Sequence, residues 1–200
     1  MSKLAVILTP ETVDILYTQV EDLKIKLGEF DYEVVAVLNT MPKSLNAFKD
    51  NTNLIMIGVG ELSVTNKRGL ARYLINKDTK FIMFLTNVKT LNKEELEKRL
   101  KYLEVEQMIG VVGDKQELID PFEQKVLMHK LLTELLLDKE EFDKRCLDEK
   151  GDAKSVMSNK FLTSVKLWDK LGGLRAVSEN AILEFCLRAS ALGYTILNIK

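Results

Sequence analysis

The sequence predicts an α/β protein whose first 120 or so residues form a five-stranded, parallel, doubly wound sheet. Five apolar runs of strand length follow one another along this part of the chain. Each run is nearly continuous in Val, Ile, Leu and Met, which is typical of parallel strands that are buried on both faces. Segments with helical periodicity and capping residues separate the runs, so strand and helix alternate as in a parallel α/β sheet.

The expected strands share this apolar character and a length of six or seven residues. They are Lys3–Thr9, Tyr32–Leu38, Asn53–Val59, Lys80–Thr86 and Gln107–Val112. Because polar residues do not alternate with apolar ones along them, we expect helices to cover both faces of the sheet.

The first expected helix covers residues 11–27. It follows Thr9-Pro10, where a proline suits the first helical turn, and it ends at Gly28. A short helix is expected near residues 43–48, and a third near residues 66–75. The third helix has three apolar residues on one face: Leu70, Tyr73 and Leu74.

A fourth helix is expected near residues 92–105, with Asn92 as its N-cap and Glu95 completing a capping box. The fifth begins at Asp120-Pro121-Phe122-Glu123, which combines an N-cap aspartate, a first-turn proline and a nearby glutamate. No breaker follows before Gly151. A helix of about 27–30 residues would be about 40–45 Å long, whereas strands measure about 20 Å. This helix is therefore expected to project beyond the sheet.

The charge pattern divides the chain into three expected units: residues 1–137, 138–154 and 155–200. Residues 138–154 include 12 charged side chains and are interpreted as a solvated helical connector. Residues 155–200 are expected to form a small, mainly helical unit, broken at Gly172-Gly173 and capped again by Ser178, with a β-prone end. The projecting helix would offer a surface to a protein partner, most simply a second copy of the chain, through Leu131, Leu135, Phe142 and Cys146.

Composition limits the classes of function. The chain has 29 basic and 30 acidic residues, so no overall field favours nucleic acid or an anionic membrane. Its apolar runs are far shorter than the roughly 18–20 residues that span a bilayer, and its start lacks a secretory signal pattern. A cytoplasmic protein without membrane insertion is expected. Two cysteines and one histidine have no metal-type spacing, so neither a metal nor a cofactor is predicted.

Catalytic motifs are missing from the loops where open α/β sheets bind ligands. No P-loop occurs, and Gly58-Val59-Gly60 lacks the third glycine of a dinucleotide fingerprint. His129 lies within a helical segment, without a nucleophile nearby in sequence. If the strand-end crevice binds a phosphate-bearing small molecule, five residues would line it: Thr9, Thr12, Gly58, Gly60 and Thr86.

Residues 1–137 resemble a CheY-like receiver domain in the order and lengths of their elements. Residues 53–57 are similar to the third receiver strand, and residues 81–87 to the fourth, which ends in a hydroxyl residue, here Thr86. Asp120-Pro121-Phe122 resembles the Lys-Pro-Phe that opens the last receiver helix.

The resemblance implies a receiver that cannot be phosphorylated. The family's acidic pair, its phosphoacceptor aspartate and its lysine correspond here to Thr9-Pro10, Gly58 and Asp120. Such a chain is similar to the receiver-like docking part of TadZ/CpaE-type localisation proteins. The leading hypothesis is therefore a non-enzymatic regulatory or scaffolding module that dimerises.

A second hypothesis is DNA binding by a helix-turn-helix-like segment near residues 168–191. Its basic residues would contact phosphates and its polar residues base edges. The candidate residues are Lys170, Arg175, Ser178, Asn180 and Arg188. The third hypothesis is the crevice site for a phosphate-bearing small molecule.

Overall fold

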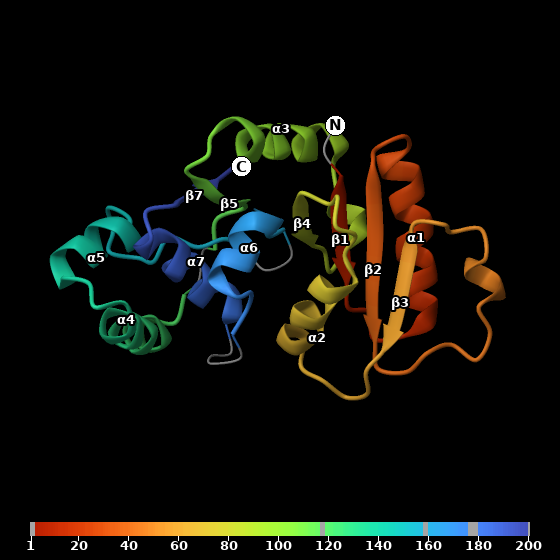
Figure 1. Ribbon diagram of the computed structural model, residues 1–200, viewed down its shortest axis with the longest axis horizontal. Helices are drawn as coiled ribbons and strands as arrows, with labels where there is room; N and C mark the ends of the chain where they lie inside the picture. Colours follow the sequence, from red (N-terminus) through yellow and green to blue (C-terminus); the bar gives the residue numbers. More distant parts are fainter. Residues whose placement is uncertain (1–2, 117–118, 158–159, 176–179, 200) are drawn as a thin grey trace.

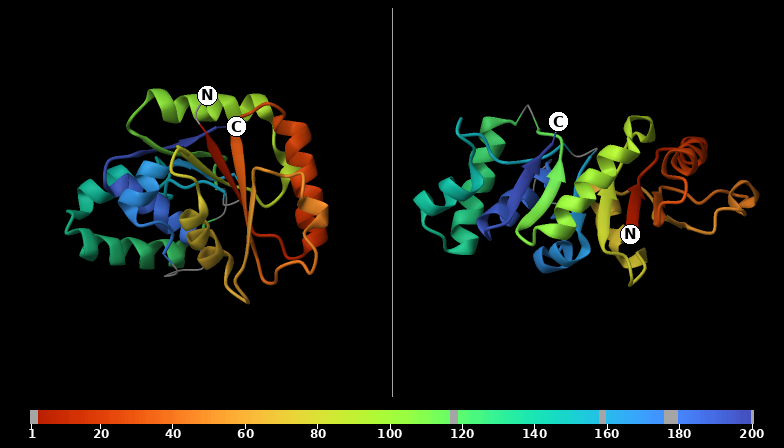
Figure 2. Two further views of the ribbon diagram at one scale, coloured as in Figure 1. Left: turned by 45° about the vertical axis from the view of Figure 1, so that its right-hand side comes forward. Right: turned by 90° about the horizontal axis from the view of Figure 1, so that it is seen from above.

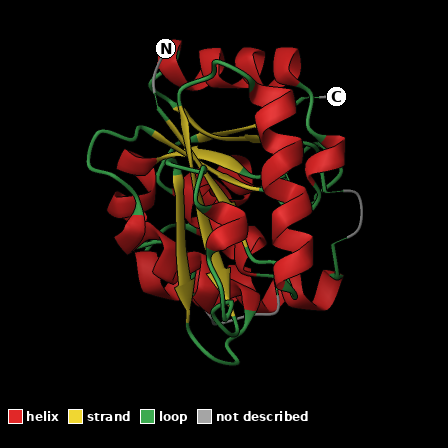
Figure 3. Ribbon diagram, turned by 90° about the vertical axis from the view of Figure 1, so that its right-hand side faces the viewer, coloured by secondary structure: helices red, strands yellow, loops and turns green. Residues whose placement is uncertain are grey.

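The molecule is built around one mixed sheet of seven strands, with helices on both faces (Figures 1 and 3). The computed structural model describes residues 3–116, 119–157, 160–175 and 180–199. The strands are β1 (Leu4–Leu8), β2 (Tyr32–Leu38), β3 (Leu54–Gly58), β4 (Phe81–Phe84), β5 (Ile109–Gly113), β6 (Leu162–Ser164) and β7 (Thr195–Asn198). The first five confirm the strand positions expected from the apolar runs, to within two or three residues at each end.

The order of the strands is β3-β2-β1-β4-β6-β5-β7. β6 runs antiparallel to both of its neighbours, β4 and β5, whereas the other neighbouring strands run parallel. The expected five-stranded, parallel, doubly wound sheet is therefore wrong. A strand from the C-terminal part of the chain separates β4 from β5, and Thr163 in it donates its hydroxyl to the carbonyl of Gly110 at 2.7 Å.

The helices are α1 (Val13–Leu27), α2 (Val64–Ala71), α3 (Lys93–Val105), α4 (Pro121–Leu135), α5 (Lys139–Cys146), α6 (Val165–Leu171) and α7 (Ala181–Ala191), with short 3-10 turns η1 (Asn46–Phe48), η2 (Arg72–Leu74) and η3 (Val88–Thr90). Two of the helices, α3 and α4, begin at the capping residues that the sequence predicts, Asn92 and Asp120. Asn92 caps α3 by accepting a hydrogen bond from the Glu95 amide, as expected. Thr12, rather than the Thr9-Pro10 pair, caps α1.

Two apolar cores cover the two faces of the sheet. α1 and α3 pack on one face, and α2, α6 and α7 on the other. Figure 2 shows the helices distributed along both sides of the strands. Side chains of β1 alternate between the cores, with Leu4 and Val6 on the first face and Ala5 and Ile7 on the second. Burial on both faces explains why the strands are apolar throughout.

The predicted long helix is wrong, because it breaks into α4 and α5. Leu136 adopts the left-handed conformation (φ 52°, ψ 34°), and this ends α4. Asp138 then accepts hydrogen bonds from the amides of Glu140 and Glu141, so it caps a new helix. The chain folds back there instead of projecting, and α5 lies beside α7.

The residues predicted to form an interaction surface mostly lie in a third core cluster. Leu131, Phe142 and Cys146 are buried there against Leu183 and Leu187 of α7, with Leu135 at its edge. These side chains therefore hold α4 and α5 onto the body of the molecule. The expected docking role of this segment is wrong for the buried residues, because a partner cannot reach them.

The C-terminal residues belong to the same sheet as the N-terminal ones. β6 pairs with β4 and β5, and β7 adds to the edge beside β5. The unit boundaries expected near residues 137 and 154 therefore do not divide the sheet, which contains strands from both sides of them. None of the helices in the described ranges is long and apolar enough to cross a bilayer.

Candidate functional site

The carboxyl ends of β1 and β4 meet where the chain changes direction across the sheet. From β1 the chain continues to β2 and β3 on one side, and then crosses to β4 on the other. Ile7, near the end of β1, pairs with Phe84, the last residue of β4. In open α/β sheets, ligands bind outside the carboxyl ends of the strands at such a switch point. This edge is the expected place for a ligand.

A groove of about 860 Å³ lies between α2 and α6. It extends from the first turn of α2, near this edge, to Ile75 and Lys77, which precede β4. Thr65, Asn66 and Gly69 line one wall, and Trp168 and Gly173 line the other. Its volume is in the range of about 300–1,000 Å³ that is usual for small-molecule sites. Because α2 starts six residues after β3 ends, its first turn brings this wall to the carboxyl edge.

The far wall of the groove is a tight turn that α7 holds in place. Gly172 and Gly173 both have positive φ (73° and 72°), which favours glycine, and they end α6. A Cβ on Gly173 would also lie 3.0 Å from the ring of Trp168. Arg188 of α7 donates hydrogen bonds to the carbonyls of Leu171 and Gly173. The helix core thus fixes the position of the turn.

An ion pair crosses the groove. The Arg72 guanidinium donates two hydrogen bonds of 2.7 Å to the Asp169 carboxylate. The pairing raises the pKa of Arg72, so its charge is retained and neutralised within the groove. This bidentate contact links η2 to α6.

Two other hollows are less suited to a ligand of the carboxyl edge. One, also of about 860 Å³, is lined by Thr79, Lys80 and Met108 at the amino end of the strands. The other, of about 440 Å³, lies against α1 and is lined by Thr86 and Asn87 after β4. Only the second adjoins the switch point, and it is about half the size of the α2–α6 groove.

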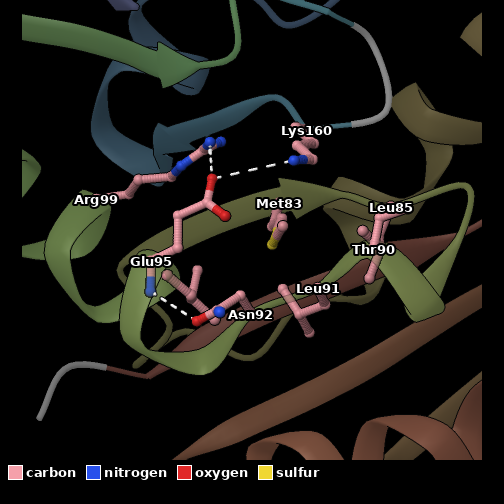
Figure 4. Close-up of a pocket in the computed structure, with 9 residues that line it drawn as sticks. Met83, Leu85, Thr90, Leu91, Asn92, Glu95, Arg99 and Lys160 are labelled. Atoms are coloured by element: carbon pink, nitrogen blue, oxygen red, sulfur yellow. Dashed lines mark hydrogen bonds and ion pairs between the residues drawn. The ribbon is translucent and has the colours of Figure 1, made fainter. Parts of the chain in front are cut away.

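A third, very small pocket of about 10 Å³ adjoins a cluster of ion pairs (Figure 4). Arg99 of α3 contacts Glu95 and Asp114, and Lys160 lies 2.8 Å from Asp114. Partial burial disfavours the charged form of Asp114, but hydrogen bonds from Lys160 and Arg99 outweigh it and lower the pKa. The cluster neutralises itself, and it fastens α3 to the ends of β5 and β6.

The apolar face predicted near residues 66–75 is only partly buried. Leu70 and Tyr73 are 37% and 86% exposed, whereas Leu74 packs against the second core. Lys67 and Arg68 of α2 are instead buried, with only 6% and 5% exposed. The sequence pattern did not predict that these two cations are buried. Violations of local patterning of this kind tend to occur at functional sites.

Arg68 is a buried cation with no counter-ion among the described residues. Its guanidinium carbon lies 4.7 Å from the centroid of the Phe84 ring. Among the described residues no hydrogen-bond partner reaches its Nε atom, and no carboxylate pairs with the side chain. Burial lowers its pKa to about 10, which still leaves it protonated at neutral pH. A desolvated cation–π contact contributes about 2 kcal/mol, whereas burying a charge costs several kcal/mol.

The five residues predicted to line the strand-end crevice all lie at the carboxyl edge. Thr9 follows β1, Gly58 ends β3, Gly60 follows it, and Thr86 follows β4. The Thr12 hydroxyl is already used, since it accepts the hydrogen bond that caps α1. Thr86 lines the smaller hollow, where its carbonyl accepts a hydrogen bond from Gln19. Ligand binding by these residues stays a prediction.

The residues predicted to read DNA do not form one exposed surface. All eleven residues of α7 are buried, so this helix cannot enter a DNA groove in this fold. Arg188 pairs with buried Glu184, Arg175 pairs with Glu134, and Asn180 caps α7. Lys170 contacts the Tyr194 hydroxyl and ring. Ser178 lies outside the described residues.

The α2–α6 groove and the buried cations were not predicted. The sequence does place Lys67 and Arg68 side by side in a helix, but nothing local shows that their face is the buried one. No group of three or more His, Cys, Asp or Glu side chains that could hold a metal occurs within the described ranges. In particular, Leu85-Thr86-Asn87 after β4 offers no carboxylate.

Comparisons with known proteins define the fold as GT-A-like. The chain matches no protein-family model and no curated protein sequence. It resembles the mannosyltransferase PcManGT from Pyrobaculum calidifontis, solved with GDP-Man and Mn²⁺, at a TM-score of 0.66 and 13% identity. This match covers 98% of the present chain but only 54% of the mannosyltransferase, so the chain spans about half of that protein.

Two further solved structures have the same type of fold. One is 4-diphosphocytidyl-2C-methyl-D-erythritol synthase from Anaerococcus prevotii DSM 20548, with a TM-score of 0.53, 9% identity, and coverage of 99% of this chain and 86% of the synthase. The other is TarS from S. aureus, with a TM-score of 0.57, 15% identity, and coverage of 99% and 35%. At these identities the likeness establishes the fold alone.

These findings overturn two interpretations of the sequence. The receiver-like resemblance, including the comparison with TadZ/CpaE-type proteins, is wrong, because the sheet is mixed and its neighbours are transferase folds. The expectation of a non-enzymatic scaffolding module falls with it, since the matching structures include glycosyltransferases and a nucleotidyltransferase. The apolar runs could not reveal this, because parallel strands look alike in both folds.

Proposed function

We propose that this chain is a transferase of the glycosyltransferase type that binds a nucleotide-activated sugar at the carboxyl edge of its sheet. The observation that carries the proposal is the fold. Nearly the whole chain superposes on enzymes, one of which was solved with GDP-Man. The switch point between β1 and β4, with the α2–α6 groove beside it, is a suitable place for such a ligand.

The groove has the chemistry that a phosphorylated ligand requires. Thr65 and Asn66 offer hydroxyl and amide donors on the first turn of α2, where backbone amides also favour anions. Lys77 adds positive charge to the same groove, whereas the charge of Arg72 is already neutralised by Asp169. A nucleotide-activated sugar brings two negatively charged phosphates and many hydroxyl groups, and these donors are complementary to both.

The residues at this edge do not fit the Mn²⁺ that accompanies GDP-Man in the mannosyltransferase structure. Hard divalent cations bind clusters of carboxylate and other oxygen ligands. The described residues contain no such cluster, and the residues that directly follow β4 carry no carboxylate. We therefore assign no step of the proposed function to a metal.

The proposal predicts that nucleotide sugars stabilise the protein. Thermal unfolding would be measured with GDP-mannose, UDP-glucose, CDP and CTP, and with ribose 5-phosphate as a control for simple phosphate binding. At a concentration of 100 times Kd, a ligand adds about 2.7 kcal/mol to the free energy of unfolding. For a chain of this size, that is a rise in Tm of roughly 5–10 °C. If no nucleotide at millimolar concentration raises Tm above the control, the proposal is wrong.

Two expectations from the sequence remain as proposals. We propose that the protein is cytoplasmic and that it forms a homodimer, although the buried surface of α4 and α5 can no longer mediate the contact. Exposed Phe122 and Val126 on α4 are apolar residues that a second copy could cover. Light scattering after size exclusion at micromolar concentration tests the dimer, and a monomer mass would exclude it. DNA binding stays an untested expectation, and α7, the helix expected to read DNA, is buried in this fold.

A further inference from the structure

Arg68 lies over the switch point of the sheet. It stacks on Phe84, which ends β4 and pairs with Ile7 of β1. The ring of Phe84 in turn lies 5.4 Å from that of Trp168, which lines the groove. Thr65, Asn66 and Gly69, on the same helix as Arg68, line the opposite wall. Arg68 does not itself line the groove. Its guanidinium lies on the sheet side of α2, over Phe84 at the carboxyl end of β4.

This cation pairs with no carboxylate among the residues that the structure describes. No hydrogen bond or ion pair of Arg68 is formed with any described residue, and only its Nε atom is both fully enclosed and unbonded. The two terminal nitrogens are not fully enclosed, and they form no hydrogen bond with a described residue. Lys67 beside it is also buried without an ion pair in the described ranges. Buried charges normally have a partner, and its absence indicates that the partner comes from outside.

We propose that Arg68, assisted by Lys67, binds the diphosphate of the nucleotide-activated sugar and supplies the positive charge that a metal would otherwise provide. The inference rests on the proposed function, and it specifies how that site recognises its ligand. A guanidinium binds two oxygens of a phosphate with a pair of parallel hydrogen bonds. Arg68 and Lys67 together carry two positive charges, which match the two charges of a diphosphate diester.

The chemistry around this edge is consistent with a site that works without a metal. The described residues offer no carboxylate cluster for a cation, while Arg68 and the adjacent Lys67 of α2 are buried without an ion pair among them. A divalent cation next to Arg68 and Lys67 would be repelled by them. The negative ligand that neutralises the two side chains is therefore expected to bind directly.

The test measures binding to the full chain by calorimetry. The probes are GDP-mannose, UDP-glucose and inorganic pyrophosphate, each with 5 mM EDTA and again with Mn²⁺, together with the uncharged nucleosides guanosine and uridine. Arg68→Met keeps much of the aliphatic stem and removes the charge. We expect at least one diphosphate to bind in EDTA, and Arg68→Met to weaken it by about 10- to 100-fold. If guanosine or uridine binds, Arg68→Met should change its affinity less than twofold.

A matched control and a stability measurement separate a binding role from a structural one. Arg72→Gln removes a charge from the same segment, but Asp169 already neutralises that charge. The substitution should therefore lower the affinity for the diphosphate less than threefold. Without ligand, Arg68→Met should have an unchanged or higher Tm, because it removes an uncompensated buried charge. A lower Tm with unchanged affinity would show that Arg68 is structural.

Each remaining outcome also decides the matter. Nucleotide binding that requires Mn²⁺, or that Arg68→Met leaves unchanged, overturns the inference and leaves the proposed function standing. A third outcome is that the chain binds pyrophosphate but no nucleotide sugar, and that Arg68→Met loses the pyrophosphate binding. This result would support an anion site at Arg68 and would overturn the proposed function. If the wild-type chain binds neither pyrophosphate nor a nucleotide sugar in EDTA, the inference is wrong.

Discussion

Glu184→Gln is expected to lower the free energy of unfolding by about 3–5 kcal/mol, because it breaks a buried ion pair on one side only. Glu184 and Arg188 are one turn apart on α7, and only 1% and 2% of their surfaces are exposed. Two contacts of 2.7 Å join the guanidinium to the carboxylate. The amide would leave the Arg188 charge with uncharged partners, which are the carbonyls of Leu171 and Gly173 and the Phe185 ring. Urea unfolding followed by circular dichroism measures the change.

The control is the same substitution in an exposed pair with the same spacing. Glu141 and Arg145 are also four residues apart, on α5, but 48% and 36% of their side chains are exposed. Glu141→Gln should cost less than about 1 kcal/mol, since solvent screens such pairs. Equal effects of the two substitutions would mean that the Glu184–Arg188 pair is not buried as described. Glu184→Gln should also loosen the Gly172-Gly173 turn, because Arg188 holds this turn by hydrogen bonds to its carbonyls.

The sequence was sufficient to place strands and helix starts that depend on local chemistry. The run Tyr32–Leu38 coincides with β2 at both ends, because a strand buried on two faces is apolar at every position. Asn92 and Asp120 were identified as helix caps, because the side chain bonds amides within the same turn. Such features require only neighbouring residues, so they can be found without the rest of the fold.

The order of the sheet could not be predicted in the same way. β6 has only three residues, and its central Thr163 is polar, so it is too short to stand out as a strand. Its place depends on β4 and β5, which lie about 80 and about 50 residues earlier in the chain, respectively. The insertion of this strand changes a parallel sheet into a mixed one. It therefore also changes the class of protein that the fold suggests.

The candidate site was missed for a related reason. Positions at the carboxyl edge were predicted from strand ends, and Thr9, Gly58 and Thr86 do lie there. The face that α2 turns to the sheet, however, depends on how the helix packs, and the sequence pattern did not predict that Arg68 lies on it. Burial of Arg68 can be recognised only when its surroundings are known, since an arginine in a helix is usually exposed.

Phe142→Ala is expected to lower the free energy of unfolding by about 3–5 kcal/mol, the usual cost of removing a fully buried phenylalanine. No part of Phe142 is exposed, and it packs with Leu131 of α4 and Leu187 of α7 in the third core cluster. For a chain of this length the loss corresponds to roughly 6–20 °C in Tm. Calorimetry measures it, and hydrogen exchange should show faster exchange in α4 and α5 than in β1, which lies in the central sheet.

Phe122→Ala is the matched control, because it removes the same side chain from the first turn of α4, where 74% of it is exposed. Its effect should remain within about 0.5 kcal/mol. The comparison also decides between the two descriptions of residues 121–146. A projecting helix would leave Phe142 with little contact, so the two substitutions would cost nearly the same. A large difference is expected only if the chain turns at Leu136 and returns α5 to the body of the molecule.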